Sequence, residues 1–364
     1  MGTSLKCIQL AFVLLATASV GAQSPVPVPP TPVEPITAIL DVSRTHEIVA
    51  LSDPHGNMQL QAFLLSLIRD ARFPAAVNDI VIETLSSRYQ DAIDRFVRGD
   101  DIPRDALRKA WEDHTVPGTG TQVEEMLRAV RAVNASLGSD RRLRVIAGDP
   151  PIDWDNITSA QDHRRWIELR DTYPADLIRR QVLERGRHAV VIYGQGHLQR
   201  RQIVSNYDMS TWQAQTIVSL LEHDAGVRVF NVWTLLDRNA ELPEGIARWR
   251  VPSLAIMQGT TLGAADFGRY SRGLGDGTRF AVRSDRGAGA AYQLVPLPRE
   301  EWKTMRMEDQ FNALLYLGAP SSMTDEPMQA ALCQDAQFVK TRLERLALFA
   351  PPFEVDNFKR ACGL

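Results

Sequence analysis

The amino-acid sequence predicts an α/β fold, with a mostly parallel central sheet, helices on both of its faces and a helical C-terminal elaboration. Short runs of Val, Ile and Leu recur between residues 46 and 233, separated by segments with apolar residues at helical spacing. Strands buried on both faces appear as such continuous runs, and parallel strands need helical connections. We therefore expect one α/β domain over 36–364, with its core at 45–235 and the elaboration at 236–364.

The individual elements follow from these two patterns. Strands are expected at 47–52, 79–83, 143–147, 189–193 and 227–233. Helices are expected at 59–69, 88–98, 104–113, 121–137, 159–170, 174–184 and 211–223. After residue 235 the alternation weakens. There we expect strands at 253–257 and 291–295, a Gly-rich loop at 263–289, and helices at 309–317 and 334–348.

The first 35 residues predict an exported protein. Residues 8–20 form an uncharged, mostly apolar run after Lys6, and Val20-Gly21-Ala22 has the small residues of a cleavage site, so 1–22 is predicted to be a signal peptide. The run is shorter than the ~20 residues that cross a bilayer, although an uncleaved anchor is the alternative. The Pro-rich segment 23–35 predicts an extended linker. We expect a periplasmic or secreted protein without stable membrane insertion after cleavage.

Charge and cysteine content narrow the partners. The chain carries 41 basic and 44 acidic residues and no long basic run, which disfavours a nucleic acid or an acidic membrane and favours a small-molecule or peptide substrate. Cys333 and Cys362 could form a disulfide in an oxidising compartment, contributing about 3 kcal/mol, or remain free thiols. Neither lies near a histidine in the sequence.

Four expected strands end on titratable side chains. The first leads into Ser52-Asp53-Pro54-His55-Gly56, the second ends on Glu83, the third on Asp149, and the fourth on Gly194-Gln195-Gly196-His197. Ligands of open parallel sheets bind at the carboxyl ends of the strands, so these side chains are expected to meet at one edge. The pattern therefore predicts an active site there.

Each of these residues also has a structural interpretation. His55 could cap the following helix, Glu83 could pair with Arg88 or Arg95, and Asp149 before two prolines could fix a turn. Nothing structural requires a histidine at position 197. The remaining histidines lack this context and are expected to be surface or packing residues: His46, His114, His163, His188 and His223.

The motifs at these strand ends resemble a known superfamily. His55-Gly56, a strand ending in Glu83 and Gly194-x-x-His197 resemble the group that joins erythromycin esterases, ChaN-like haem-uptake proteins and Tiki/TraB proteases. The esterase branch typically has Gly-Glu-x-x-His-Gly, where this chain has Ser52-Asp53. Arg170-Asp171 resembles the Arg-Asp pair of the esterase branch. The resemblance covers about residues 45–200 and implies a hydrolase or a ligand-binding protein.

Two hydrolytic mechanisms fit these residues. In the first, a neutral His55 or His197 accepts a proton from water, Glu83 orients the imidazole, and Arg170 or the other histidine stabilises the oxyanion, with Asp53, Asp149 and Asp171 in supporting positions. Without a Gly-x-Ser-x-Gly motif, direct attack of water on an ester or amide is favoured. In the second, His55, Glu83 and His197 hold a divalent metal that activates the water, as in the Tiki-like branch.

The alternative from another class is a ChaN-like protein that binds haem or another small ligand. Tyr193 and Tyr89 lie close enough to the motifs in the sequence to be considered as axial ligands, beside the histidines. An inactive relative is the third hypothesis, since Ser52-Asp53 departs from the esterase pattern. The substrate itself is not specified by the sequence, because loops such as 99–120 and 263–289 are expected to form the walls of the pocket.

Overall fold

The structure is a computed structural model of the chain. It describes residues 26–364 apart from 117–120, 206–210, 225, 236–241, 243, 268–279, 283–292, 296–304 and 351. Its centre is a seven-stranded sheet in the order β3-β2-β4-β1-β7-β11-β8. The bounds of these strands are β1 (Ile48–Ser52), β2 (Asp79–Ser86), β3 (Arg144–Asp149), β4 (Ala189–Tyr193), β7 (Val229–Thr234), β8 (Ser253–Ile256) and β11 (Ala313–Tyr316).

All neighbouring strands of this sheet pair in parallel, except that β8 runs antiparallel to β11 at one edge. Every residue of β1 and β4 is buried, as the continuous apolar runs predict. Side chains alternate between two cores: Val49 and Leu51 face one, Ile48 and Ala50 the other. The predicted mostly parallel α/β class is confirmed.

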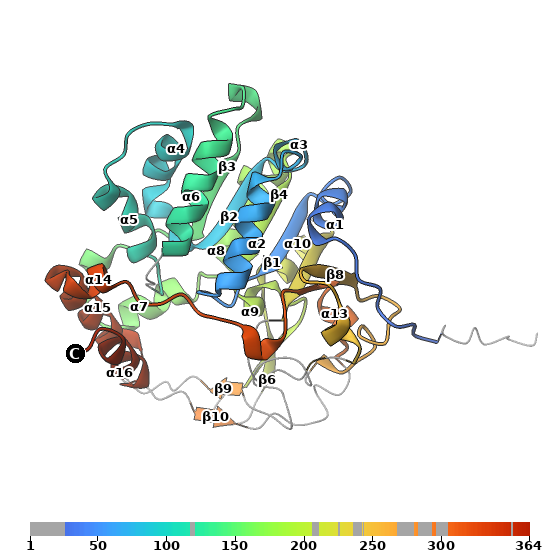
Figure 1. Cartoon of the computed structure of the whole chain (residues 1–364). Helices are drawn as coiled ribbons and strands as arrows, with labels where there is room; N and C mark the ends of the chain where they lie inside the picture. The colour runs from blue at the N-terminus through green and yellow to red at the C-terminus, as the bar shows by residue number, and fades with distance from the viewer. Residues whose placement is uncertain are drawn as a thin grey trace, which may run out of the picture.

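Helices cover both faces of the sheet (Figure 1). One face carries α1 (Pro35–Val42), α2 (Met58–Arg69), α3 (Phe73–Ala76), α4 (Gln90–Arg98), α5 (Arg104–Glu112) and α6 (Thr121–Asn134). The other carries α8 (Thr172–Gln181), α9 (Gln195–Leu198) and α10 (Ile217–Asp224). Short 3-10 turns connect elements: η1 (Ser87–Tyr89), η2 (Ser139–Arg141), η3 (Trp154–Asn156), η4 (Leu183–Arg185), η5 (Ile246–Arg248) and η6 (Pro320–Ser322). Apart from α1 and α3, which the sequence patterns did not predict, the order of strands and helices up to β4 follows the expected one.

Two expectations for the later elements are wrong. The helix expected at 211–223 is split into β6 (Thr211–Ala214), which pairs with β5 (Gln202–Ser205), and α10. The helix expected at 309–317 is α13 (Met307–Gln310) followed by β11, because a short apolar run between β7 and β8 satisfies its backbone as a strand. The strand expected at 291–295 is present as β10 (Gln293–Val295), which pairs antiparallel with β9 (Phe280–Val282) outside the central sheet.

The Pro-rich segment before α1 is extended but is not a detached linker. Val33 exchanges two backbone hydrogen bonds with Leu254 of β8, of 2.8 and 3.0 Å. Val28 likewise pairs with the turn around Thr260. This segment therefore covers part of the sheet edge at β8. The predicted signal peptide and its cleavage site lie outside the described residues, and within the described ones no helix is long and apolar enough to cross a membrane.

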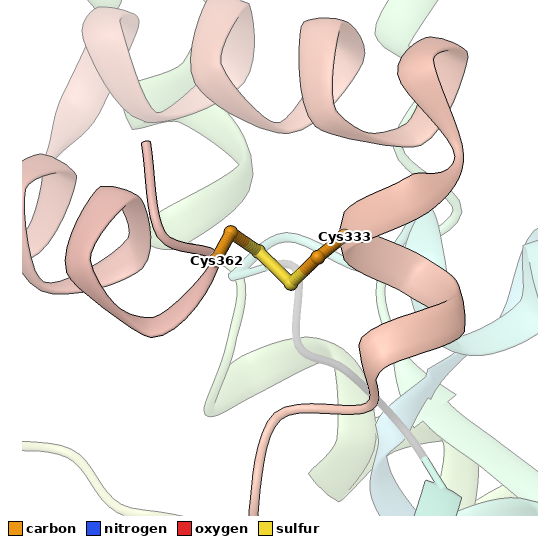
Figure 2. The surroundings of a disulfide bond; sticks show 2 residues. All are labelled: Cys333 and Cys362. Atoms are coloured by element: carbon orange, nitrogen blue, oxygen red, sulfur yellow. A yellow bond between two sulfur atoms is a disulfide. The ribbon is translucent and has the colours of Figure 1, made fainter.

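The C-terminal elaboration is helical at its end, as expected. It comprises α14 (Ala330–Gln334), α15 (Ala336–Phe349) and α16 (Pro352–Ala361), with a small apolar cluster of its own. A disulfide joins Cys333 to Cys362, with their Cα atoms 5.1 Å apart (Figure 2). The helices lie beside α5 and α7 (Ala160–Ile167), where the Phe349 ring stacks on that of His163 at 4.4 Å (Figure 1).

Candidate active site

A buried carboxylate, Glu83 on β2, lies at the centre of the predicted site and is only 2% exposed. Its Oε1 accepts a hydrogen bond from the guanidinium of Arg170 and lies 3.5 Å from Nε2 of His197. Its Oε2 accepts one from the N–H of Gly194 and lies 3.5 Å from Nε2 of His55. Burial alone would raise the pKa of Glu83, but the two imidazoles and Arg170 outweigh it and lower the pKa to about 2. Glu83 is therefore ionised at neutral pH.

His55 follows β1 in a strained loop. Its φ of 65° is in the left-handed region, uncommon for a residue other than glycine. Asp53 holds this conformation: Oδ1 accepts a 2.8 Å hydrogen bond from the His55 N–H, and Oδ2 lies 3.4 Å from Nδ1. Burial in the site would lower the pKa of His55, but Glu83 and Asp53 raise it to about 9. With 45% of the side chain exposed, the imidazole is accessible and protonated at neutral pH.

His197 lies in α9, directly after β4. Its Nδ1 donates a 2.8 Å hydrogen bond to Oδ1 of Asp171, which also accepts one from the N–H of Ile217 at 3.2 Å. A carboxylate at Nδ1 fixes the tautomer and leaves Nε2 facing Glu83. Gly194 leaves room for this approach, because a Cβ there would make a tight contact of 3.3 Å with Glu83 Oε2 and ordinary contacts of 3.5 Å with both imidazoles. The two histidines thus face opposite oxygens of one carboxylate.

The structure brings together all four residues expected to be catalytic and corrects how they are oriented. The sequence hypothesis made Glu83 the group that orients an imidazole. Instead Asp53 and Asp171 hold the Nδ1 side of His55 and His197 respectively, and Glu83 faces both Nε2 atoms. The alternative partners of Glu83 are occupied elsewhere: Arg88 pairs with Asp153, and Arg95 with Asp100.

Asp149, at the end of β3, contacts Arg170 and Thr115 and, among the described residues, makes no hydrogen bond to Glu83. It is buried and accepts hydrogen bonds from the N–H and hydroxyl of Thr115, at 2.6 and 2.5 Å. Its Oδ1 lies 3.8 Å from Nε of Arg170. Burial raises the pKa of Asp149 to about 7 against the opposing effects of Arg170 and Thr115. Asp149 therefore holds both Thr115, in the segment after α5, and the arginine that contacts Glu83.

A pocket of about 220 Å³ opens beside His55. Its walls include Trp111 of α5, Met126 of α6 and His114, which follows α5. Sequence reasoning set His114 aside as a surface or packing residue. The only signal that pointed to it was the expectation that the 99–120 loop forms a wall of the pocket. The other loop expected there, 263–289, lies largely outside the described residues.

The chemistry of these donors does not fit the metal hypothesis. Both oxygens of Glu83 already accept hydrogen bonds, from Arg170 and Gly194. A guanidinium that is hydrogen-bonded to this carboxylate would repel a divalent cation bound to the same carboxylate. Across the part of the chain that the structure describes, no group of three or more His, Cys, Asp or Glu side chains is arranged to hold a metal ion. The arrangement instead suits proton transfer between a carboxylate-supported imidazole and a bound water.

Of the two tyrosines considered as haem ligands, Tyr193 is buried and Tyr89 is engaged by a carboxylate. Tyr193 is 1% exposed, and burial raises its pKa well above the usual range. The Tyr89 hydroxyl donates a 2.5 Å hydrogen bond to Asp113, on the C-terminal side of α5. The two site histidines were also considered as axial ligands. The side chain of His55 is the more exposed of the two, at 45% against 19% for His197.

Comparison with known proteins identifies the fold. No family model matches the sequence, and no curated protein matches it in sequence. Structures with a similar fold include a mutant of the erythromycin esterase EreC in its open conformation, at 11% identity and TM-score 0.50, covering 80% of this chain and 94% of that one. They also include a succinoglycan biosynthesis protein (11%, TM-score 0.48, 79% and 94% covered) and ChaN of Campylobacter jejuni with cofacial haem (12%, TM-score 0.37, 56% and 86% covered).

The chain therefore shares the fold of the erythromycin esterase, and the resemblance expected from the strand-end motifs is confirmed at that level. Identities near one in ten residues define the fold and leave the reaction open. Function has to be argued from the site.

Proposed function

We propose that this protein is an exported hydrolase that attacks an ester or amide bond with a water molecule activated by its His/Glu site. The observation that carries the proposal is the buried Glu83 carboxylate, held ionised between two imidazoles and Arg170. A buried negative charge so arranged stabilises a neighbouring imidazolium, the species formed when histidine removes a proton from water. The disulfide between Cys333 and Cys362 supports export, because such bonds persist in oxidising compartments.

His197 is the general base in this proposal. Asp171 accepts a hydrogen bond from the Nδ1–H group, so the lone pair of this ring is on Nε2, where it can accept a proton from water. As Nε2 takes the proton, the positive charge develops 3.5 Å from Glu83 Oε1, where the carboxylate stabilises it. General-base catalysis of this kind contributes roughly 10²–10⁴-fold to a rate.

His55 acts on the opposite side of the reacting carbonyl. It is protonated at neutral pH and its side chain is 45% exposed, so it can donate a hydrogen bond to the developing oxyanion, while the leaving group takes the proton that His197 removed from water. The charge of Arg170 is largely compensated by its contacts with Glu83 and Asp149. We therefore assign the oxyanion to His55 and a structural role in holding Glu83 to Arg170.

The test is hydrolysis of generic p-nitrophenyl esters and of peptide amides by the mature protein. We expect His197→Ala and His55→Ala each to lower kcat/KM by roughly 10²-fold or more. His46→Ala is the matched control, because it removes an imidazole that precedes β1, at the other end of the strand from His55, and should leave hydrolysis unchanged. Equal activity in all four proteins would show that these histidines do not catalyse the reaction.

The haem-binding alternative makes a different prediction. A Soret band on addition of haem to the wild-type protein, abolished in His55→Ala, would show a ligand-binding protein in place of the hydrolase.

The hypothesis of an inactive relative rests on Ser52-Asp53, yet the Asp53 carboxylate contacts both the backbone N–H and the ring Nδ1 of His55 and holds its conformation. This departure from the esterase pattern therefore preserves a positioning group.

A further inference from the structure

We propose that the pocket beside His55 binds one compact, uncharged group of the substrate, which accepts a hydrogen bond from His114 while its apolar part contacts Trp111 and Met126. The inference rests on the proposed hydrolase, because it names the substrate feature that would place the scissile bond against His55. Three independent properties of the pocket carry it: its unpartnered donor, its apolar walls and its size.

The donor is the imidazole of His114, which is 3% exposed. Its Nδ1 accepts a hydrogen bond from the N–H of Val116 at 3.3 Å, so the ring proton is on Nε2. Nε2 is buried and has no hydrogen-bond partner among the described residues. Burial, assisted by the charge of Arg170, holds the pKa of His114 well below its usual range, so the ring is neutral. A buried N–H without an acceptor is costly to the folded protein, which favours a ligand oxygen as its partner.

The apolar part of the lining comes from three helices. Leu60 and Leu64 project from α2, Trp111 from α5, and Val123 and Met126 from α6. All five side chains are at most 5% exposed. Gln61, Thr84 and Gln122 add uncharged polar groups to the lining, and the pocket offers mainly apolar surface to aliphatic or aromatic groups.

Charged side chains also line the pocket: the carboxylates of Asp53 and Glu326 and the imidazole of His55. Because these groups carry both signs, they do not select the charge of the group that enters. The neutral character of that group follows from the apolar walls, where a charge would lose its hydration without compensation.

Size sets the remaining limit. A cavity of about 150 Å³ lined by aliphatic side chains holds a benzene molecule, whereas sites for drug-sized ligands measure about 300–1,000 Å³. At about 220 Å³ this pocket holds a phenyl or branched aliphatic group with one carbonyl or ether oxygen. The remainder of a larger substrate has to lie outside, over the exposed side of His55.

Binding can be tested without turnover by using two probes of almost the same shape. Acetophenone has an acceptor oxygen, and ethylbenzene does not. Protein-observed NMR on the Trp111 indole signal would give both dissociation constants, in wild type and in His197→Ala. We expect acetophenone to bind about fivefold tighter, the effect of one net hydrogen bond.

Two variants separate the donor from the walls. His114→Leu should make the two probes bind equally, and Val123→Phe, which fills the pocket, should weaken both more than tenfold. His46→Leu is the matched control and should keep the fivefold preference. Equal binding of the probes to wild type, or unchanged binding to Val123→Phe, would overturn the proposal.

The same experiment distinguishes the two proposals. Because binding is also measured in His197→Ala, it does not depend on hydrolysis. The expected probe preference together with an inert wild-type protein would refute the hydrolase and leave the pocket standing. Hydrolysis by a protein that shows no probe preference would refute the pocket alone.

Discussion

Replacing Glu83 by glutamine tests the centre of the site, since it removes one charge and almost no volume. A glutamine oxygen can still accept the N–H of Gly194, so the backbone contact is retained. The ion pair with Arg170 and the attraction to both imidazoles are lost. The change therefore isolates the electrostatic role of Glu83.

The size of the effect follows from the groups that remain around His55. Burial and Arg170 both lower the pKa of this imidazole, and without Glu83 only Asp53 still raises it. The pKa should fall from about 9 toward or below its ordinary value of 6.5, so that His55 is mainly neutral at about pH 7.5. We expect hydrolysis to fall at least tenfold, because the protonated donor is lost together with the anion that stabilises the His197 imidazolium.

Stability should change with a defined pH dependence. Glu83 has a folded-state pKa of about 2 against 4.5, so its contribution is present above pH 4.5 and is lost as the pH falls through 2. His55 has a raised pKa, so its contribution is present below pH 6.5 and is lost as the pH rises through 9. Both reflect one shared interaction and count once. Between pH 4.5 and 6.5, Glu83→Gln should lower the free energy of unfolding by about 3 kcal/mol. This is the low end of the range for a broken buried ion pair, because Asp149 still faces Arg170.

The assay is an NMR titration of the histidine ring protons, which is tractable with 7 histidines, combined with ester hydrolysis and urea unfolding. Asp79→Asn is the matched control: Asp79 is equally buried on β2 and is paired with Arg144 and Arg187. It should lose comparable stability while His55 keeps its pKa and hydrolysis is unchanged. A pKa of His55 that stays near 9 in Glu83→Gln, or wild-type hydrolysis in that variant, would refute the reasoning.

The remaining predictions concern the supporting groups. Asp171→Asn should lower kcat more than tenfold with little effect on KM, because it destabilises the tautomer in which Nε2 of His197 accepts a proton; an unchanged kcat would contradict this. EDTA should leave hydrolysis unchanged, whereas loss of activity that added zinc restores would show a metal mechanism. Peptide mapping without reductant should find Cys333 linked to Cys362, and reduction should lower the free energy of unfolding by about 3 kcal/mol; two free thiols in the native protein would contradict the bond.

The meeting of His55, Glu83 and His197 could be predicted because topology decides it. Parallel strands place their carboxyl ends at one edge of the sheet, independently of side-chain conformation. Residues at the carboxyl ends of β1, β2 and β4 therefore had to be neighbours. Which carboxylate faces which ring nitrogen depends on rotamers and on contacts between residues far apart in the chain. The pairs His197–Asp171 and Arg170–Glu83 are such contacts, and no local pattern specifies them.

The wrong expectations have a different cause. The apolar run of β11 is too short for periodicity to distinguish a strand from a buried helix, and its position between β7 and β8 decides the outcome. His114 was expected to be a surface or packing residue because it does not follow a predicted strand end. Here the carbonyl of the next residue, Thr115, is hydrogen-bonded to the His163 ring, and its side chain to Asp149, so the loop is drawn into the core.

The two buried carboxylates around Arg170 differ in pKa, and the proposed mechanism depends on this difference. Glu83, between two imidazoles, stays ionised far below neutral pH, whereas burial raises the pKa of Asp149 to about 7 despite its hydrogen bonds from Thr115. In the proposed mechanism, the ionised Glu83 keeps His55 protonated, so that His55 serves as the hydrogen-bond donor. His197, whose Nδ1 donates to Asp171, is assigned the role of base. Each histidine has a carboxylate at Nδ1 and Glu83 at 3.5 Å from Nε2, so exposure is what distinguishes them: the side chain of His55 is 45% exposed and that of His197 is 19% exposed.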